Sequence, residues 1–303
     1  MKSEDIEAVA ARLAEHPDFR VIRRLDTARP RPTLSGATVR RAAIVDTETT
    51  GTEAAADKII ELAVVVFEYC RETGAVGRVL ETYDGLEDPG MPIPPESTAI
   101  HGITDAMVAG KRIDDAAVAR LLEGVGIVIA HNARFDRGFL ERRLPVFATV
   151  AWGCSWQEVP WSEAGIESSK LEYLAYRYGF FYEGHRAEVD CLALLEVLRQ
   201  PFAASGTTTL KLLLDSARKP SFRLWANNSP FESKDVLRNR GYRWVPDKRC
   251  WYGELSSREQ LQAELAWLKD TVFGGKSVAL DLDEFDARTR YSDREGKREK
   301  VRT

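Results

Sequence analysis

The sequence has few of the features that build disulfide-bonded or membrane-spanning proteins. Only 4 of its 303 residues are cysteines, and none forms a CxxC motif. Scattered cysteines are typical of buried free thiols in a reducing compartment, so we expect a cytoplasmic location. The longest apolar runs, 62–67 and 127–130, are much shorter than the roughly 20 residues that a spanning helix requires. We therefore expect no membrane segment, and the charged N-terminal stretch predicts no export signal.

The formal net charge of −4 hides an uneven distribution along the chain. Residues 1–214 carry a net charge of −8, whereas residues 215–255 carry +4. The overall composition, 44% hydrophobic and 30% charged, is that of a globular protein and excludes wholesale disorder. An acidic first part can bind cations, and a basic second part favours a polyanionic partner.

Periodic patterns divide the first two thirds of the chain into two parts. Residues 3–15 have apolar side chains at helical spacing, and a proline-rich stretch follows at 29–36, so residues 1–38 are predicted to be a helical extension and linker. Residues 39–210 are predicted to form one mixed α/β domain, because strand patterns alternate with helical ones. The strand patterns lie at 42–45, 59–68, 76–83 and 126–130, and the helical patterns at 106–109, 114–122, 133–143, 170–178 and 187–198.

Residues 215–275 are predicted to form a second, smaller α+β domain in the order βαββα. Basic residues alternate there with aromatic ones, from Arg218 and Arg223 to Trp251 and Tyr252. Cationic side chains neutralise phosphates and exposed aromatic rings stack on unpaired bases, so this pattern favours nucleic-acid binding over a purely structural or protein-docking role. Residues 276–303 change from acidic to basic and are predicted to be a solvated, disordered tail.

Asp46 and Glu48 lie two residues apart at the end of a predicted strand. Because side chains alternate between the faces of a strand, both carboxylates are expected on one face. Two adjacent negative charges are tolerated where a cation offsets them, which predicts a divalent-metal site. A solvated surface pair is the alternative for this motif taken alone.

Two further motifs place polar residues where a helix begins. In HNARFD, Asn132 is placed to cap a helix and Asp136 projects from its first turns. Taken alone, a helix cap and a favourable charge at a helix N-terminus explain this motif. In HRAEVD, Asp190 lies in an apolar helix, where an unpaired charge is costly, so it needs a partner such as a metal ion. His185 precedes that helix.

The order DTETTG, HNARFD and H-x4-D resembles that of the DEDDh exonucleases, the DnaQ-like family of the proofreading epsilon subunit and of ribonuclease T. Residues 92–104, PIPPESTAIHGIT, also resemble the segment between the first two motifs of that family. The resemblance covers residues 42–198 and implies a ribonuclease H-like mixed sheet flanked by helices. The chain departs from the family at Gly153-Cys-Ser-Trp156, which affects the expected substrate contacts more than the chemistry.

The resemblance also implies a catalytic set of Asp46, Glu48, Asp136, His185 and Asp190. Two Mg²⁺ or Mn²⁺ ions are expected, one bound by Asp46, Glu48 and Asp190 and the other by Asp46 and Asp136. His185 is the expected general base, because imidazole accepts a proton near neutral pH. The candidates for binding the terminal nucleotide are Thr47, Thr49, His101, Thr104, Asn132 and Phe135.

The resulting functional hypothesis is a metal-dependent 3′–5′ exonuclease that releases nucleoside monophosphates, with DNA preferred over RNA. Its expected partners are nucleic-acid 3′ ends and polymerase or repair proteins, in proofreading, repair or turnover. One alternative is a 3′–5′ exoribonuclease that trims short or structured RNA. Another is a non-catalytic nucleic-acid-binding protein of the same fold. The sequence does not decide the oligomeric state.

Overall fold

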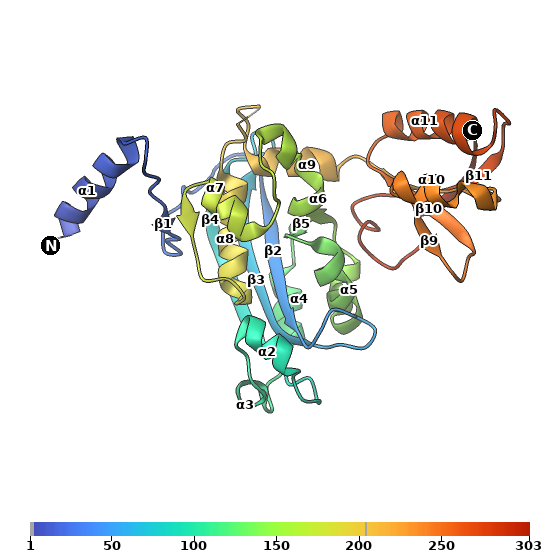
Figure 1. Ribbon diagram of the computed structural model, residues 1–303. Helices are drawn as coiled ribbons and strands as arrows, with labels where there is room; N and C mark the ends of the chain where they lie inside the picture. Colours follow the sequence, from blue (N-terminus) through green and yellow to red (C-terminus); the bar gives the residue numbers. More distant parts are fainter. Residues whose placement is uncertain (1–2, 204) are drawn as a thin grey trace.

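A computed structural model describes residues 3–203 and 205–303, which form two units, each built on a five-stranded sheet (Figure 1). The strands of the first sheet are β2 (Val39–Thr49), β3 (Ile59–Cys70), β4 (Val76–Leu86), β5 (Val125–Ala130) and β6 (Trp152–Cys154). They lie in the order β4-β3-β2-β5-β6. β3 is antiparallel to both neighbours, whereas β2, β5 and β6 are parallel to one another. This is the ribonuclease H-like arrangement, so the predicted fold class is confirmed.

Helices cover both faces of the first sheet. The helices of the first unit are α2 (Pro95–His101), α3 (Asp105–Val108), α4 (Asp115–Leu121), α5 (Ala133–Arg143), α6 (Ser155–Glu158), α7 (Leu171–Arg177), α8 (Ala187–Arg199) and α9 (Thr209–Ala217), with 3-10 turns η1 (Pro145–Ala148) and η2 (Trp161–Ala164). α7, α8 and α9 pack on one face, and α4 and α5 on the other. β3 is buried along almost its whole length, which explains why its sequence is a nearly continuous apolar run.

The second unit has strands β8 (Ser221–Trp225), β9 (Arg243–Val245), β10 (Cys250–Leu255), β11 (Ala279–Phe285) and β12 (Lys297–Arg302). Its helical segments are η3 (Phe231–Ser233), α10 (Lys234–Asn239), α11 (Arg258–Trp267) and the π-helical turn η4 (Leu268–Val272). The strand order is β12-β11-β8-β10-β9. Leu237 of α10 and Leu261 and Leu265 of α11 pack on one face of this sheet. The predicted βαββα segment is present, and two more strands follow it.

The prediction of a disordered tail at 276–303 is wrong. β11 pairs with β8, and β12 pairs with β11, so these residues complete the second sheet. Leu280 and Leu282 are fully buried against the helices, while Asp281 and Asp283, which alternate with them, pair across the sheet with basic residues of β12. The alternation of charged and apolar residues is therefore that of a half-buried strand rather than of a solvated tail.

The connection between β11 and β12, residues 286–296, returns to the first unit, and we call it the return loop. The backbone N–H of Trp152 in β6 donates to the carbonyl of Ala287. Arg137 of α5, which is fully buried, donates to the carbonyls of Arg288 and Arg290. Arg290 in turn forms a buried ion pair with Glu158 of the first unit. These contacts fix the second unit against the first.

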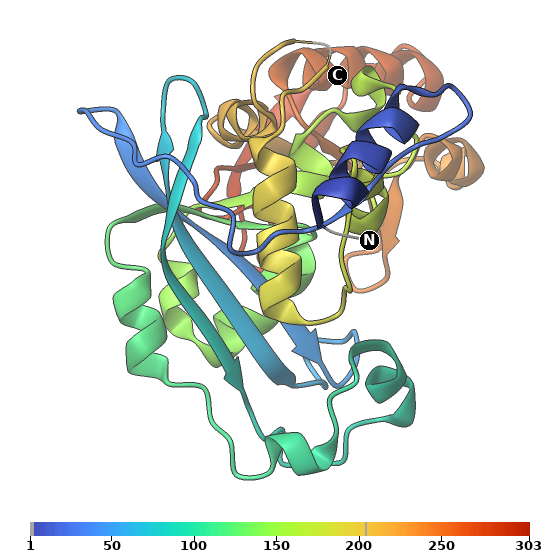
Figure 2. The same cartoon turned by 90° about the vertical axis from the view of Figure 1, so that its left-hand side faces the viewer.

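The N-terminal segment lies on the other side of the first unit. Helix α1 (Ser3–Glu15) projects from the body of the molecule in Figure 1 and therefore lies nearest the viewer in Figure 2. Its Glu7 pairs with Arg23 at 2.7 Å, next to the short parallel pair of β1 (Arg23–Arg24) and β7 (Phe180–Phe181). No helix among the described residues is long and apolar enough to cross a membrane.

Candidate active site

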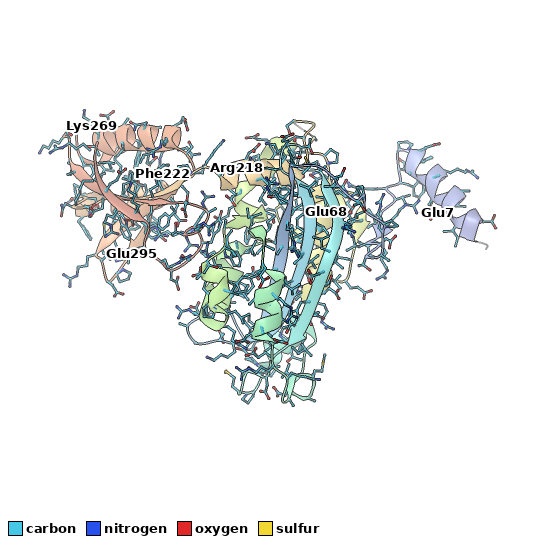
Figure 3. All side chains as sticks on the ribbon, turned by 180° about the vertical axis from the view of Figure 1, so that it is seen from behind. Glu7, Glu68, Arg218, Phe222, Lys269 and Glu295 are labelled. Atoms are coloured by element: carbon cyan, nitrogen blue, oxygen red, sulfur yellow. The ribbon has the colours of Figure 1, made fainter. Side chains whose placement is uncertain are left out.

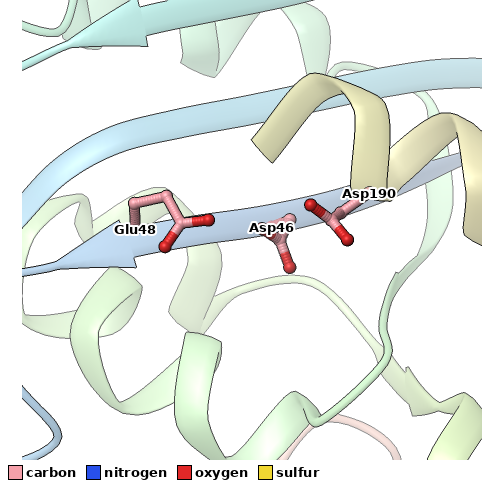
Figure 4. Close-up of side chains that lie close together, drawn as sticks. All are labelled: Asp46, Glu48 and Asp190. Atoms are coloured by element: carbon pink, nitrogen blue, oxygen red, sulfur yellow. The ribbon is translucent and has the colours of Figure 1, made fainter. Parts of the chain in front are cut away.

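Two segments that lie far apart in the sequence bring three carboxylates together. Asp46 and Glu48 lie on β2, and Asp190 lies in the first turn of α8, which packs across β2. Figure 4 shows the three side chains next to one another between the strand and the helix. One oxygen from each carboxylate lies within 4.8 Å of the others. Three oxygen ligands at this spacing fit a hard divalent ion such as Mg²⁺ or Mn²⁺.

Asp136 is the fourth carboxylate of the cleft that contains this group. It lies in the first turn of α5 and is only 3% exposed. The hydroxyl of Thr47 donates a hydrogen bond to its Oδ1 atom at 3.0 Å, so β2 holds α5 in place at this point. Thr47 and Asp46 are neighbours on the strand and point in opposite directions, which explains how one strand contacts both carboxylate-bearing helices.

Burial and mutual repulsion disfavour the charged forms of these groups. Burial raises the pKa of Asp46 far above its usual value, and the negative charges of Asp136, Asp190 and Glu48 raise it further. Burial, followed by the charge of Asp190, raises the pKa of Glu48 to about 8. Burial raises the pKa of Asp136 to about 7, although its hydrogen bond from Thr47 acts in the opposite direction. A bound cation would offset this repulsion and restore the ionised forms.

Asp190 has the partners that its apolar helix requires. The hydroxyl of Tyr182 donates to its Oδ1 atom at 3.1 Å, and the backbone N–H of Arg186 donates to its Oδ2 atom at 3.2 Å. Burial still raises its pKa, against the effect of the Tyr182 hydrogen bond. The two hydrogen bonds hold the carboxylate toward Asp46 and Glu48.

His185 lies at the mouth of the same cleft, in the loop before α8. Its backbone has a positive φ of 67°, in the left-handed region that few residues other than glycine adopt. The side chain is 54% exposed, and its Nε2 atom lies 4.0 Å from a carboxylate oxygen of Glu172. The imidazole therefore lines the cleft and is open to solvent.

Glu61 is a residue of this region that the sequence analysis missed. It lies directly opposite Glu48 in the β2–β3 register and is fully buried. Its carboxylate accepts hydrogen bonds from the Arg186 guanidinium at 2.6 Å and from the backbone N–H of Ala187 at 3.0 Å. The contacts of Glu61 with Arg186 and Ala187 therefore hold the His185 loop and the start of α8 against the sheet. The signal in the sequence is a lone glutamate inside a long apolar strand, where a charge needs a partner.

The cleft has a volume of about 450 Å³. It is lined by the carboxylates and His185, and by Thr47, His131, Asn132, Phe135, Trp156, Ser169, Lys170, Leu171 and Glu172. Asn132 occupies the N-cap position of α5 but makes no side-chain cap hydrogen bond, contrary to expectation, so its amide is available to a ligand. His131 bonds Ser155 and the carbonyl of Ser169, which fixes the turn before α5.

Trp156 is the main addition to the predicted substrate residues. Its ring stacks on that of His131, with centroids 6.3 Å apart and planes at 14°, and the residue is 49% exposed. It belongs to the Gly153-Cys-Ser-Trp156 segment, where the chain departs from the family pattern. An exposed ring at the rim of the cleft can stack on a base.

Three of the six predicted nucleotide contacts line the cleft, and three do not. Thr49 donates to the carbonyl of Gly51, so its hydroxyl serves the local turn. His101 is buried, and its Nδ1 atom accepts from the backbone N–H of Ile103, while its Nε2 atom has no partner among the described residues. Thr104 is exposed at the start of α3. These three side chains are therefore not among the residues that line the cleft.

Comparison with known proteins assigns the family. The Exonuclease family model matches residues 43–198, just over half of the chain. The chain is 32% identical over 162 residues to DNA polymerase III subunit epsilon of Treponema pallidum, and this match covers 50% of the chain and 72% of that protein. The chain therefore belongs to the Exonuclease family. The resemblance to the DnaQ-like exonucleases is confirmed.

Two further relatives match this chain over only a small part of their own length. The DNA polymerase III subunit epsilon-like protein of Rhodobacter capsulatus is 34% identical over 200 residues, covering 58% of this chain and 26% of that protein. The DNA polymerase III PolC-type of Clostridium perfringens is 30% identical over 165 residues, covering 52% of this chain but only 11% of that protein. The chain thus spans only 26% and 11% of the lengths of these two relatives.

Solved structures of exonucleases are also similar to part of the chain. Exonuclease X in complex with 5′ overhanging duplex DNA is 26% identical with a TM-score of 0.41, over 56% of this chain and 99% of that chain. E. coli Exonuclease I in complex with a dA16 oligonucleotide is 17% identical with a TM-score of 0.45, over 61% of this chain and 48% of that chain. The family assignment rests on the sequence matches rather than on these two structures.

Proposed function

We propose that the protein is a metal-dependent 3′–5′ exonuclease that releases nucleoside monophosphates, with DNA as its preferred substrate. The observation that supports this proposal best is the group of Asp46, Glu48 and Asp190, whose ligand atoms lie within 4.8 Å of one another. An acidic cluster alone is common, but this one is buried in a cleft with Asp136 and His185, in the domain that matches the Exonuclease family.

The carboxylates would hold the metal, and the other groups would handle the proton and the strand. Asp46, Glu48 and Asp190 are proposed to bind one divalent ion, and Asp46 and Asp136 a second. Such ions lower the pKa of the attacking water and stabilise the leaving 3′-oxygen. His185 is proposed to accept the proton of that water, and its exposed position lets it pass the proton to solvent. Thr47, Asn132, Phe135 and Trp156 would position the terminal nucleotide.

The preference for DNA is supported by the relatives, which are named as DNA polymerase III subunits or polymerases. By the same similarity, polymerase or repair proteins are proposed partners and the cytoplasm is the proposed location. An exoribonuclease with the same residues is the alternative. Metal-assisted hydrolysis at a 3′ end can proceed whether the 2′ carbon carries a hydrogen, as in DNA, or a hydroxyl group, as in RNA.

The test uses strands labelled at the 5′ end. Wild-type protein is incubated with single-stranded and duplex DNA and RNA, in Mg²⁺, Mn²⁺ or EDTA. We expect a ladder of progressively shorter labelled products with either metal, faster on DNA, and none in EDTA. Release of the label as a mononucleotide at the start would show the opposite polarity, and a ladder in EDTA would exclude a metal-dependent mechanism.

A further inference from the structure

Within the described residues, the helices of the second unit pack on one face of its sheet and leave the other face without a helix. Residues paired directly across neighbouring strands share a face. Phe222, Leu224, Leu280 and Leu282 face the helices, in the core of the second unit. We call the opposite side the open face, and the strand register assigns to it Arg223, Trp225, Arg243, Tyr252, Glu254, Asp281, Asp283, Arg298 and Lys300.

The open face combines cations with aromatic rings. The ammonium group of Lys248, from the turn between β9 and β10, lies 4.6 Å from the ring centroid of Trp225. The guanidinium of Arg223 lies 4.8 Å from the ring of Tyr252. Tyr252 is half-buried, so part of its ring reaches solvent, whereas Trp225 is only 5% exposed. Trp225 therefore packs beneath the exposed surface and does not offer its own ring for stacking.

The acidic residues of the open face are already neutralised. Asp283 accepts from Arg298 at 2.7 Å and from the indole N–H of Trp225 at 2.7 Å. Asp281 pairs with Lys300 at 2.6 Å. By contrast, Arg243 and Lys248 are exposed and form no ion pair within the described part of the chain. The surface thus presents a surplus of positive charge.

The open face adjoins the rim of the active-site cleft. Glu254 accepts hydrogen bonds at 3.0 Å from Arg223 on the open face and at 3.0 Å from Arg134 of α5. Arg134 directly precedes the cleft residue Phe135 in the sequence. A cavity of about 200 Å³ between the units is lined by Arg134, Gln157, Arg223 and Glu254, among others. Arg290, Tyr291 and Ser292 of the return loop also line this cavity.

We propose that the open face binds the single-stranded part of a nucleic acid whose 3′ end occupies the cleft. This inference rests on the proposed function. A polyanion fits the surplus of positive charge, and a sequence-tolerant groove of cations and aromatic rings is a general way to bind single strands. The protein then contacts two separate parts of one strand, so its affinity depends on strand length.

The test compares two triple variants with equal loss of charge. The open-face triple is Arg243→Gln, Lys248→Gln and Lys300→Gln. The control triple, Lys234→Gln, Lys269→Gln and Lys276→Gln, removes cations on or after the helices; Figure 3 shows Lys269 at the outer end of α11. Binding to labelled strands of about 4 and about 30 nucleotides, lengths on either side of the site size of one small binding module, is measured in EDTA with DNA and with RNA.

We expect the open-face triple to bind the long strand at least tenfold more weakly than the wild type, and the short strand with a smaller change. Its salt slope on the long strand should fall by about 1.4, because the two unpaired cations that are lost, Arg243 and Lys248, each contribute about 0.7. The control triple should match the wild type. Comparing the affinities for DNA and RNA shows whether the open face distinguishes deoxyribose from ribose.

Equal weakening by both triples, or equal weakening of long and short strands, would overturn the inference. So would a poly-glutamate chain that competes as well as the nucleic acid, because the surface would then bind any polyanion. The proposed function is judged separately, by whether the wild type shortens the short strand when metal is added. Thermal unfolding of both triples checks that neither has lost its fold.

Discussion

Arg290 offers a direct test of how the two units are joined. It is 8% exposed, and its guanidinium donates to Glu158, to the carbonyl of Lys219 and to the hydroxyl of Ser221. Arg290→Ala would leave the 8% exposed Glu158 as an unpaired charge in the interface. Removing one partner of a buried ion pair costs about 3–5 kcal/mol, so we predict a loss of this size in the free energy of unfolding.

Arg294→Ala is the matched control, because Arg294 also belongs to the return loop and pairs with Glu141 at 3.1 Å, but its side chain is 41% exposed. An exposed pair contributes about 0–1 kcal/mol. Urea unfolding of the two variants and the wild type, followed by fluorescence, measures the difference. If Arg290→Ala costs no more than Arg294→Ala, the buried pair does not join the units.

The cost of Arg290→Ala should also depend on pH. Burial raises the pKa of Glu158, and the nearby Arg290 lowers it, so the variant should have a higher pKa at this residue than the wild type. When the pKa of a carboxyl group is higher in the folded than in the unfolded protein, the free energy of unfolding falls as the pH rises from the unfolded-state pKa to the folded-state pKa. The variant should therefore be closest to the wild type near pH 5 and furthest from it near pH 8.

Three further predictions concern the active site. His185→Ala should lower turnover by roughly 10²- to 10⁴-fold and flatten the acid limb of the pH–rate profile, without changing Mn²⁺ affinity; an unaltered profile would reject His185 as the base. The pKa of Glu48 is raised to about 8 and that of Asp136 to about 7, so the native state holds protons that the unfolded state has released. The metal-free protein should thus unfold at a lower temperature at about pH 8 than at about pH 5, and added Mg²⁺ should remove most of this difference; a metal-free protein that is more stable at the higher pH would contradict it. Trp156→Ala should raise KM more than it lowers kcat, with a loss of about 1–3 kcal/mol in strand binding if the ring stacks on a base; an unchanged KM would exclude that role.

Much of the first unit was predictable because its signals are local. The apolar run of β3 and the periodicity of α5 and α8 are properties of short segments. The two-residue spacing of Asp46 and Glu48 fixes their common face, and the family motifs indicated that Asp136 and Asp190 belong to the same site. These elements and the carboxylate cluster follow from sequence pattern together with the resemblance.

The missed features depend on partners distant in the sequence. β12 has exposed charged side chains at most positions, and only its pairing with the acids of β11 makes it a strand. The return loop is polar. The charge of its buried Arg290 is tolerated because Arg290 forms an ion pair with Glu158 of the first unit. The burial of His101 could not be predicted either, because family resemblance assigns a role to a residue but does not show how its side chain packs.

The metal site is tested most directly by titrating metal-free protein with Mn²⁺, following free Mn²⁺ by its electron paramagnetic resonance signal while measuring strand cleavage in the same samples. We predict that the wild type binds Mn²⁺ and that cleavage rises over the same concentration range. Asp46→Ala should bind Mn²⁺ more weakly and show no cleavage, with an unchanged circular dichroism spectrum, because it removes the ligand proposed to be shared by both ions. Near-wild-type cleavage by Asp46→Ala in Mg²⁺ or Mn²⁺ would contradict the proposed site.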